Sequence, residues 1–74
     1  GPPLNEEDMN RLGLRLLRTK KLKEAMRALE LNVAAYPKSA NAWDSLAETY
    51  EAKGDLADAK AARRKQQALS TPSR

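Results

Sequence analysis

The 74-residue sequence contains no cysteine, histidine or phenylalanine, and its aromatic residues are one tryptophan and two tyrosines. The absence of cysteine excludes disulfide staples, and the absence of both cysteine and histidine excludes zinc sites of the usual kind. The sequence also has no glycine-rich phosphate loop and no nucleophile elbow. Carboxylates on exposed helices make poor acid–base catalysts when no cleft shifts their pKa. We therefore expect no enzyme activity, no metal and no cofactor.

Long hydrophobic runs are missing as well. No apolar stretch approaches the roughly 18 residues of a membrane span, and the N-terminus shows no signal peptide. We expect no membrane partner, and localisation stays open between the cytoplasm and, if a longer parent carries a signal peptide, the periplasm. Residues 1–3, which begin with Gly1-Pro2, resemble the scar of a cleaved tag and are set aside from the fold.

The most informative pattern is a repeat with a period of 34 residues. Four residues of the first half are matched at this spacing in the second half: Met9, Leu12, Gly13 and Leu16 by Trp43, Leu46, Ala47 and Tyr50. Ala25 is matched by Ala59, and the turn at Lys20 by Gly54. A fixed period of this length is typical of stacked helical hairpins, whose usual role is to present a surface to another protein.

Periodicity and capping residues predict four helices, over residues 6–18, 22–36, 40–53 and 56–69. Asn5, Ser39 and Asp55 are suitable N-caps. Pro37 ends the second helix, because the residue before a proline is displaced from helical angles. Gly54 ends the third helix, because glycine tolerates the left-handed conformation found there.

These helices define an all-α fold class. Because the connections are short, we expect two antiparallel helix-turn-helix hairpins stacked as a short α-solenoid. The first hairpin covers residues 4–37. The second covers residues 38–69 and ends in a polar C-terminal capping helix, and residues 70–74 form a disordered tail.

The spacing of apolar residues predicts which side of each helix faces the core. The expected core positions are Met9, Leu12, Gly13 and Leu16 in the first helix; Leu22, Ala25, Met26, Leu29, Val33 and Tyr36 in the second; Trp43, Leu46, Ala47 and Tyr50 in the third; and Leu56, Ala59, Ala62 and Leu69 in the fourth. Leu14 and Leu17 lie off the main stripe of the first helix, which predicts an open apolar face there.

Residues 5–69 resemble two tetratricopeptide repeats. The resemblance rests on the period, on the small residues Gly13 and Ala47, on the turn glycine and on Pro37. At the position where the family often has an aromatic residue stand Leu29 and Arg63, and Arg63 is not a core residue. The stretches 12–17 and 32–37 also resemble small repeat units at the C-termini of bacterial hydrolases. This second resemblance implies the tail of a larger bacterial protein.

The resemblance implies that the first helix of each hairpin lines a concave groove. Acidic residues of the third helix then offer a site for a basic or polar peptide, or form a solvated face. Arginines of the first helix offer a site for an acidic partner, pair with acids of the third helix, or contact a second copy of the chain. The predicted partner-binding residues are Asn10, Arg11, Leu14, Leu17, Arg18, Asn41, Asp44 and Glu48.

We therefore expect a protein–protein interaction module, whose partner is another protein or a second copy of itself. The favoured form is a homo-oligomerisation or docking domain excised from a larger protein, and the alternative is a peptide-binding groove. A nucleic-acid-binding domain is a remote alternative. The net charge of +4 permits it, but no aromatic residues interleave with the basic ones for base stacking.

Overall fold

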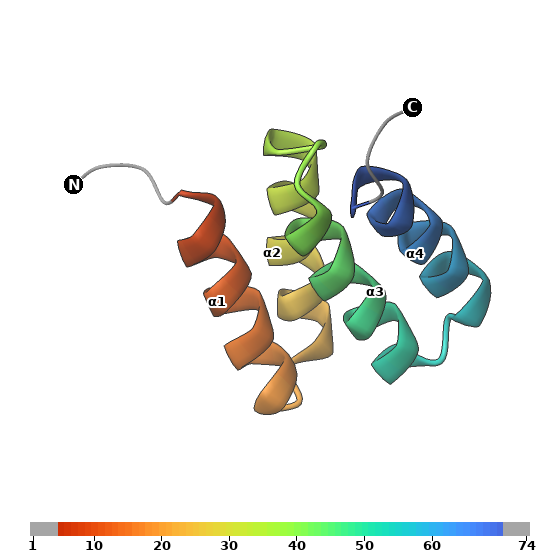
Figure 1. The fold of residues 1–74 in the computed structure, drawn as a ribbon. Coiled ribbons are helices and arrows are strands. Elements are labelled where there is room, and N and C mark those ends of the chain that lie inside the picture. The colour runs from red at the N-terminus through yellow and green to blue at the C-terminus, as the bar shows by residue number, and fades with distance from the viewer. Residues whose placement is uncertain (1–4, 71–74) are drawn as a thin grey trace.

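The computed structural model describes residues 5–70, and this part of the chain folds into four α-helices: α1 (Glu6–Arg18), α2 (Leu22–Ala35), α3 (Ala40–Lys53) and α4 (Leu56–Ser70). Helices α1 and α2 form one antiparallel hairpin and α3 and α4 a second (Figure 1). Helix α3 packs against both helices of the first hairpin. The predicted all-α fold class is confirmed. The expected tag remnant at 1–3 and residues 71–74 of the expected tail lie outside the described residues.

The predicted helix boundaries hold to within one residue. Helix α2 ends at Ala35, so Tyr36 lies outside it, directly before Pro37. Helix α4 continues through Ser70, which the sequence placed in the tail. The carboxylate of Asp55, predicted as the N-cap of α4, lies 3.3 Å from the amine of Lys53.

Side-chain caps fix the starts of α1 and α3. The Asn5 side chain accepts a hydrogen bond from the backbone N–H of Asp8 at 2.8 Å, and Ser39 Oγ accepts one from the N–H of Ala42 at 3.1 Å. These caps satisfy backbone donors that have no partner within the helix, as predicted. Ser39 Oγ also donates to Glu6 Oε2 at 2.8 Å. The start of α3 is therefore tied to the start of α1.

The two hairpin turns share one backbone geometry. The N–H of Lys21 bonds to the carbonyl of Leu16, and the N–H of Asp55 bonds to that of Tyr50, both at 2.9 Å. The residue before each donor is left-handed, with φ of 64° at Lys20 and 93° at Gly54. The 34-residue correspondence therefore extends to the turns, although the first turn holds lysine in a conformation that favours glycine.

The core lies where α3 packs on the first hairpin. Its buried apolar residues come from α2 and α3, with Trp43 and Tyr50 packed at its edge: Met26, Leu29, Val33, Ala42 and Leu46. Gly13 lies directly against Leu29, and a Cβ atom at Gly13 would be 2.4 Å from Leu29 Cγ. The small residue therefore allows α1 and α2 to approach closely.

The predicted core face of α1 is wrong in part. Leu12 is exposed, whereas Leu14 and Leu17 are half-buried and the buried positions are Asn10 and Gly13. The physical reason is the position of α3, which covers the side of α1 that carries Asn10 and Leu17. No helix of the described chain covers Leu12. The exposed leucine of α1 is therefore Leu12, whereas Leu14 and Leu17, which were predicted to form an open face, are each only partly accessible.

Three other predicted core residues are exposed: Tyr36, Leu56 and Leu69. In α4 the small residues Ala59 and Ala62 are buried as predicted, and Leu56 is 64% exposed. The helix therefore rests on α3 through alanines, while its larger apolar side chains lie at the margin.

Candidate interaction surfaces

The 34-residue correspondence shows which surfaces of the hairpin pair are free. Helix α3 presents to the first hairpin four residues that are at most 3% exposed: Ala42, Ser45, Leu46 and Thr49. Small and apolar side chains thus fill the contact between the hairpins. The equivalent residues of α1 and α4 show whether the same kind of contact is possible at either end.

At the N-terminal end face, the residues of α1 equivalent to this contact are mostly charged. They are Asp8, Arg11, Leu12 and Arg15, which line a shallow depression on the surface. Arg11 lies 4.0 Å from Asp8, and their side chains are 66% and 45% exposed. A helix packed here as the first hairpin packs on α3 would desolvate three charged groups, which is costly unless each is paired.

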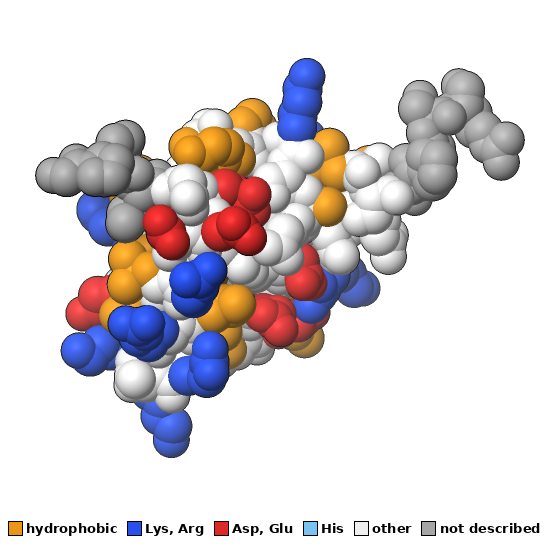
Figure 2. All heavy atoms as spheres, turned by 60° about the vertical axis from the view of Figure 1, so that its left-hand side comes forward, with side chains coloured by type: hydrophobic (Ala, Val, Ile, Leu, Met, Phe, Trp, Pro, Cys, Tyr) orange, Lys and Arg blue, Asp and Glu red, His pale blue; other side chains and the backbone are white. Residues whose placement is uncertain are grey.

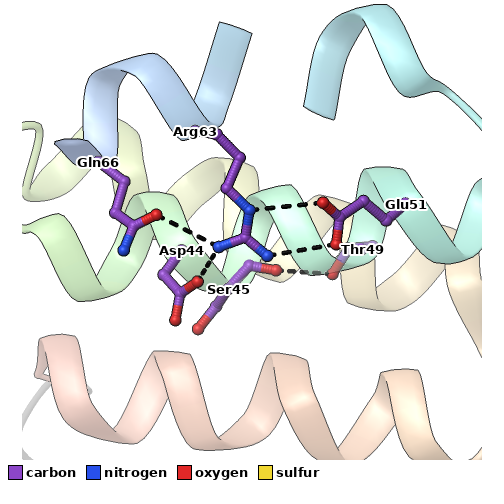
Figure 3. A network of polar contacts seen from close by, with 6 residues as sticks. All are labelled: Asp44, Ser45, Thr49, Glu51, Arg63 and Gln66. Atoms are coloured by element: carbon purple, nitrogen blue, oxygen red, sulfur yellow. Dashed lines mark hydrogen bonds and ion pairs between the residues drawn. The ribbon is translucent and has the colours of Figure 1, made fainter. Parts of the chain in front are cut away.

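At the C-terminal end face, Arg63 of α4 holds two carboxylates of α3 (Figure 3). Its Nε and Nη2 atoms donate to the two oxygens of Glu51 at 3.4 and 3.2 Å. Its Nη1 atom donates to Asp44 and, at 3.2 Å, to Oε1 of Gln66. The hydrogen bonds to Glu51 and then to Asp44 raise the pKa of Arg63, so the guanidinium stays charged.

This cluster replaces an uncharged contact of the first hairpin. Arg63 is equivalent to Leu29, which is fully buried, and Asp44 and Glu51 are equivalent to Asn10 and Leu17. In the first hairpin α3 covers these positions. In the second, the half-buried Arg63 side chain lies over them and pairs with both acids from within the same hairpin.

The third free surface is the groove face, which we define as the side of α1 and α3 turned away from both α2 and α4. At 100° per residue its members follow from the buried positions of each helix. They are Glu7, Leu14 and Arg18 of α1 and Asn41 and Glu48 of α3. Leu14 is half-buried and the other four are exposed. The groove face therefore has one partly accessible apolar side chain, which is surrounded by charged and amide groups.

Charge on the α1 side of the molecule is separated along the helix. The first turn contains Glu6, Glu7 and Asp8, whereas Arg15 and Arg18 lie in the last turn. Figure 2 shows this side, with acidic side chains in its upper part and basic ones gathered below them. The arginines of α1 do not pair with acids of α3 in the described structure, which was one of the sequence-based alternatives.

The structure does not bring the eight predicted partner-binding residues together. Four of them, Leu14, Arg18, Asn41 and Glu48, share the groove face. Asn10 and Leu17 lie on the side of α1 that α3 covers. Arg11 belongs to the N-terminal end face, and Asp44 is held by Arg63 at the C-terminal end face.

Sequence reasoning missed the pairing of Arg63 and the contribution of Glu7 to the groove face. A signal for the pairing of Arg63 was present in the sequence. The uncharged Leu29 of the first hairpin corresponds to the basic Arg63, and the uncharged Asn10 and Leu17 correspond to the acidic Asp44 and Glu51.

Among residues 5–70 no group of acidic side chains is arranged to hold a metal ion. None of the four helices described is long and apolar enough to cross a membrane.

Comparison of the chain with family models, with curated proteins and with solved structures gave no match.

Proposed function

We propose that this chain is a protein–protein interaction module of the tetratricopeptide kind, and that its groove face pairs with a second copy of itself. The observation that carries the proposal is the charge pattern around Leu14. On the groove side of α1, Glu7 precedes Leu14 by two turns and Arg18 follows it by one. Neither charge has a partner among the described residues.

This pattern is self-complementary when two α1 helices lie antiparallel across a two-fold axis. Glu7 and Arg18 are about 16 Å apart along the helix, so each pairs with the opposite charge of the other copy. Leu14 then lies near the axis and packs against its own counterpart. A two-fold interface of this kind uses the same patch twice and closes at a dimer.

The expected affinity is low. Each exposed ion pair contributes about 0–1 kcal/mol, and burying a leucine contributes about 1.5–3 kcal/mol. Two ion pairs and two leucines thus contribute at most about 8 kcal/mol, and after an association cost of at least about 4 kcal/mol we expect a Kd of about 1 mM for the isolated module. The charges set the register, and Leu14 supplies the burial.

Sedimentation equilibrium from about 20 µM to about 1 mM tests the proposal, since the upper end of this range reaches the expected Kd. We expect the average mass to rise toward that of a dimer. Leu14→Ser should abolish the rise, and Leu31→Ser, which changes an exposed leucine on α2, should leave it unchanged. A mass that stays monomeric over the whole range contradicts the proposal.

The alternative is a groove that binds an extended basic peptide, favoured by the exposed Asn41 and Glu48 on α3. The Arg63 contact removes Asp44 from this site, which leaves Glu48 as its main acid. Glu48→Lys should then abolish capture of a poly-lysine peptide without lowering the melting temperature. Unchanged capture by this variant rejects the alternative.

A further inference from the structure

The C-terminal end face contains an open groove of about 380 Å³ between the end of α3 and the side of α4. It is lined by Glu51, Leu56, Ala59, Lys60, Arg63, Arg64 and Gln67. We propose that this groove is the docking site for an acidic amphipathic helix of another protein. The site is separate from the groove face and does not depend on self-association.

The first hairpin shows what such a groove accommodates. Residues equivalent to Leu56, Lys60 and Arg63 are Leu22, Met26 and Leu29, and there α3 lies in the groove. Met26 is 8% exposed and Leu29 fully buried because α3 covers them. Two antiparallel helices therefore form a groove that is wide enough for a third helix. In the first hairpin α3 occupies this groove, and in the second the groove is open.

The charge around the open groove determines which kind of helix binds there. Lys60 and Arg64 are exposed and have no ion-pair partner among the described residues. Arg63 is paired with Glu51 and Asp44, and these three groups together carry one negative charge, which is smaller than the two positive charges of Lys60 and Arg64. The free charge at the rim is therefore positive, and Leu56 beside it offers an exposed apolar contact. A helix with an apolar stripe flanked by carboxylates matches both features.

A second copy of the chain fits this groove poorly. The helix that would continue the stack is α1, whose equivalent side carries Arg11 and Arg15 and a single acid, Asp8, which lies 4.0 Å from Arg11. These side chains would approach Lys60 and Arg64, and like charges brought together without partners oppose binding. The occupant is therefore a different, acidic helix.

The chain supplies the design of a probe. A fluorescein-labelled peptide of residues 39–54 with Trp43→Glu and Tyr50→Glu keeps the four residues by which α3 contacts the first hairpin and carries acidic flanks. A control peptide has lysine at both altered positions. We expect saturable anisotropy for the acidic peptide and at least a tenfold weaker response for the control.

Two protein variants test the location. Lys60→Glu with Arg64→Glu should weaken acidic-peptide binding at least tenfold, while Lys21→Glu with Lys38→Glu changes the net charge equally and should leave it unchanged. Absence of binding, equal loss in both variants, or binding of inorganic phosphate or phosphatidylserine vesicles in place of the peptide would overturn the proposal. Because neither pair alters Leu14, Glu7 or Arg18, the dimerisation measured by sedimentation reports independently on the proposed function.

Discussion

At the scale of single residues, Gly13 and Ala47 occupy the same position in the two hairpins but face different neighbours. Gly13 lies against the fully buried Leu29, whereas the residue equivalent to Leu29 in the second hairpin is Arg63. The leucine side chain uses the space that a Cβ atom at Gly13 would need. The long arginine side chain extends away from α4 to the acids of α3, so alanine is accommodated at position 47.

Gly13→Ala should therefore destabilise the protein. Alanine gains about 1 kcal/mol of helix propensity, but overpacking costs about 1–3 kcal/mol, and Leu29 has no exposed space into which to move. We expect a net loss of about 1 kcal/mol in the free energy of unfolding, measured by urea denaturation followed by circular dichroism. In the double variant with Leu29→Ala the added methyl group has room, so the two losses should not add. Additive losses would show that the contact is not limiting.

Lys20 has a left-handed backbone with φ of 64°, whereas its counterpart in the second turn is glycine. The left-handed conformation costs a residue with a side chain about 1–2 kcal/mol, and glycine avoids this cost. Glycine also makes the unfolded chain more flexible, which offsets part of the gain in stability. Lys20→Gly should raise the free energy of unfolding by about 0.5–1 kcal/mol. Lys21→Gly is the matched control. Lys21 has φ of −93°, which is not left-handed, so this variant should be less stable than the unaltered protein. Destabilisation of both variants would contradict this account.

At the scale of helices, the start of α3 is fixed to α1 by Ser39. Its hydroxyl caps α3 and donates to Glu6. Ser39→Ala removes both bonds and should cost about 1–2 kcal/mol in thermal or urea unfolding. Glu6→Gln keeps an acceptor for the hydroxyl and should cost less than half as much. If the two variants lose equal stability, the charge of Glu6 rather than the hydrogen bond is the stabilising element.

The helices and their ends were predictable because the signals are local. A capping side chain, a proline or a turn glycine acts on residues within one helical turn, so Asn5, Ser39, Pro37 and Gly54 indicate helix ends from sequence alone. The orientation of α1 was not predictable in the same way. Leu12 lies on the predicted apolar stripe and Leu17 lies off it, and only the position of α3 decides which of the two is covered. The Arg63 cluster likewise joins residues on different helices, which no single-helix pattern contains.

At the scale of the whole molecule, the response to alkaline pH follows from Tyr50. Burial, followed by the negative charges of Glu30, Asp58 and Asp55, raises the pKa of its phenol above the ordinary value of 10.0. The folded state therefore holds the Tyr50 proton at pH values where the unfolded chain has lost it. Above pH 10.0 the unfolded state binds fewer protons, so the free energy of unfolding should fall as pH rises.

Urea denaturation at a series of pH values from neutral to alkaline measures this effect. Tyr50→Phe should flatten the dependence above the ordinary tyrosine pKa, and Tyr36→Phe serves as the matched control. An equally steep fall in the Tyr50→Phe variant would show that other groups cause it.

The end faces and the groove face of the molecule differ in which contacts with another helix they allow. Both end faces carry charges at positions that are apolar or small in the contact between the hairpins, so a further hairpin of the same kind would desolvate Arg11 and Arg15 at one end or Lys60 and Arg63 at the other. On the groove face the charges of Glu7 and Arg18 are complementary across a two-fold axis, so pairing there joins opposite charges. This contrast is why we assign self-association to α1 and Leu14 rather than to continued stacking.

The most direct test of this assignment is a charge-reversal mixture measured by sedimentation equilibrium. Glu7→Lys and Arg18→Glu should each remain monomeric alone, because each antiparallel pair would bring like charges together, and circular dichroism should confirm that both fold. Mixed in equal amounts they should form a heterodimer, since both contacts then join opposite charges, and Lys38→Glu should behave as the unaltered chain. Dimerisation of either variant alone, or a mixture that stays monomeric while the unaltered chain dimerises, would contradict pairing through the groove face.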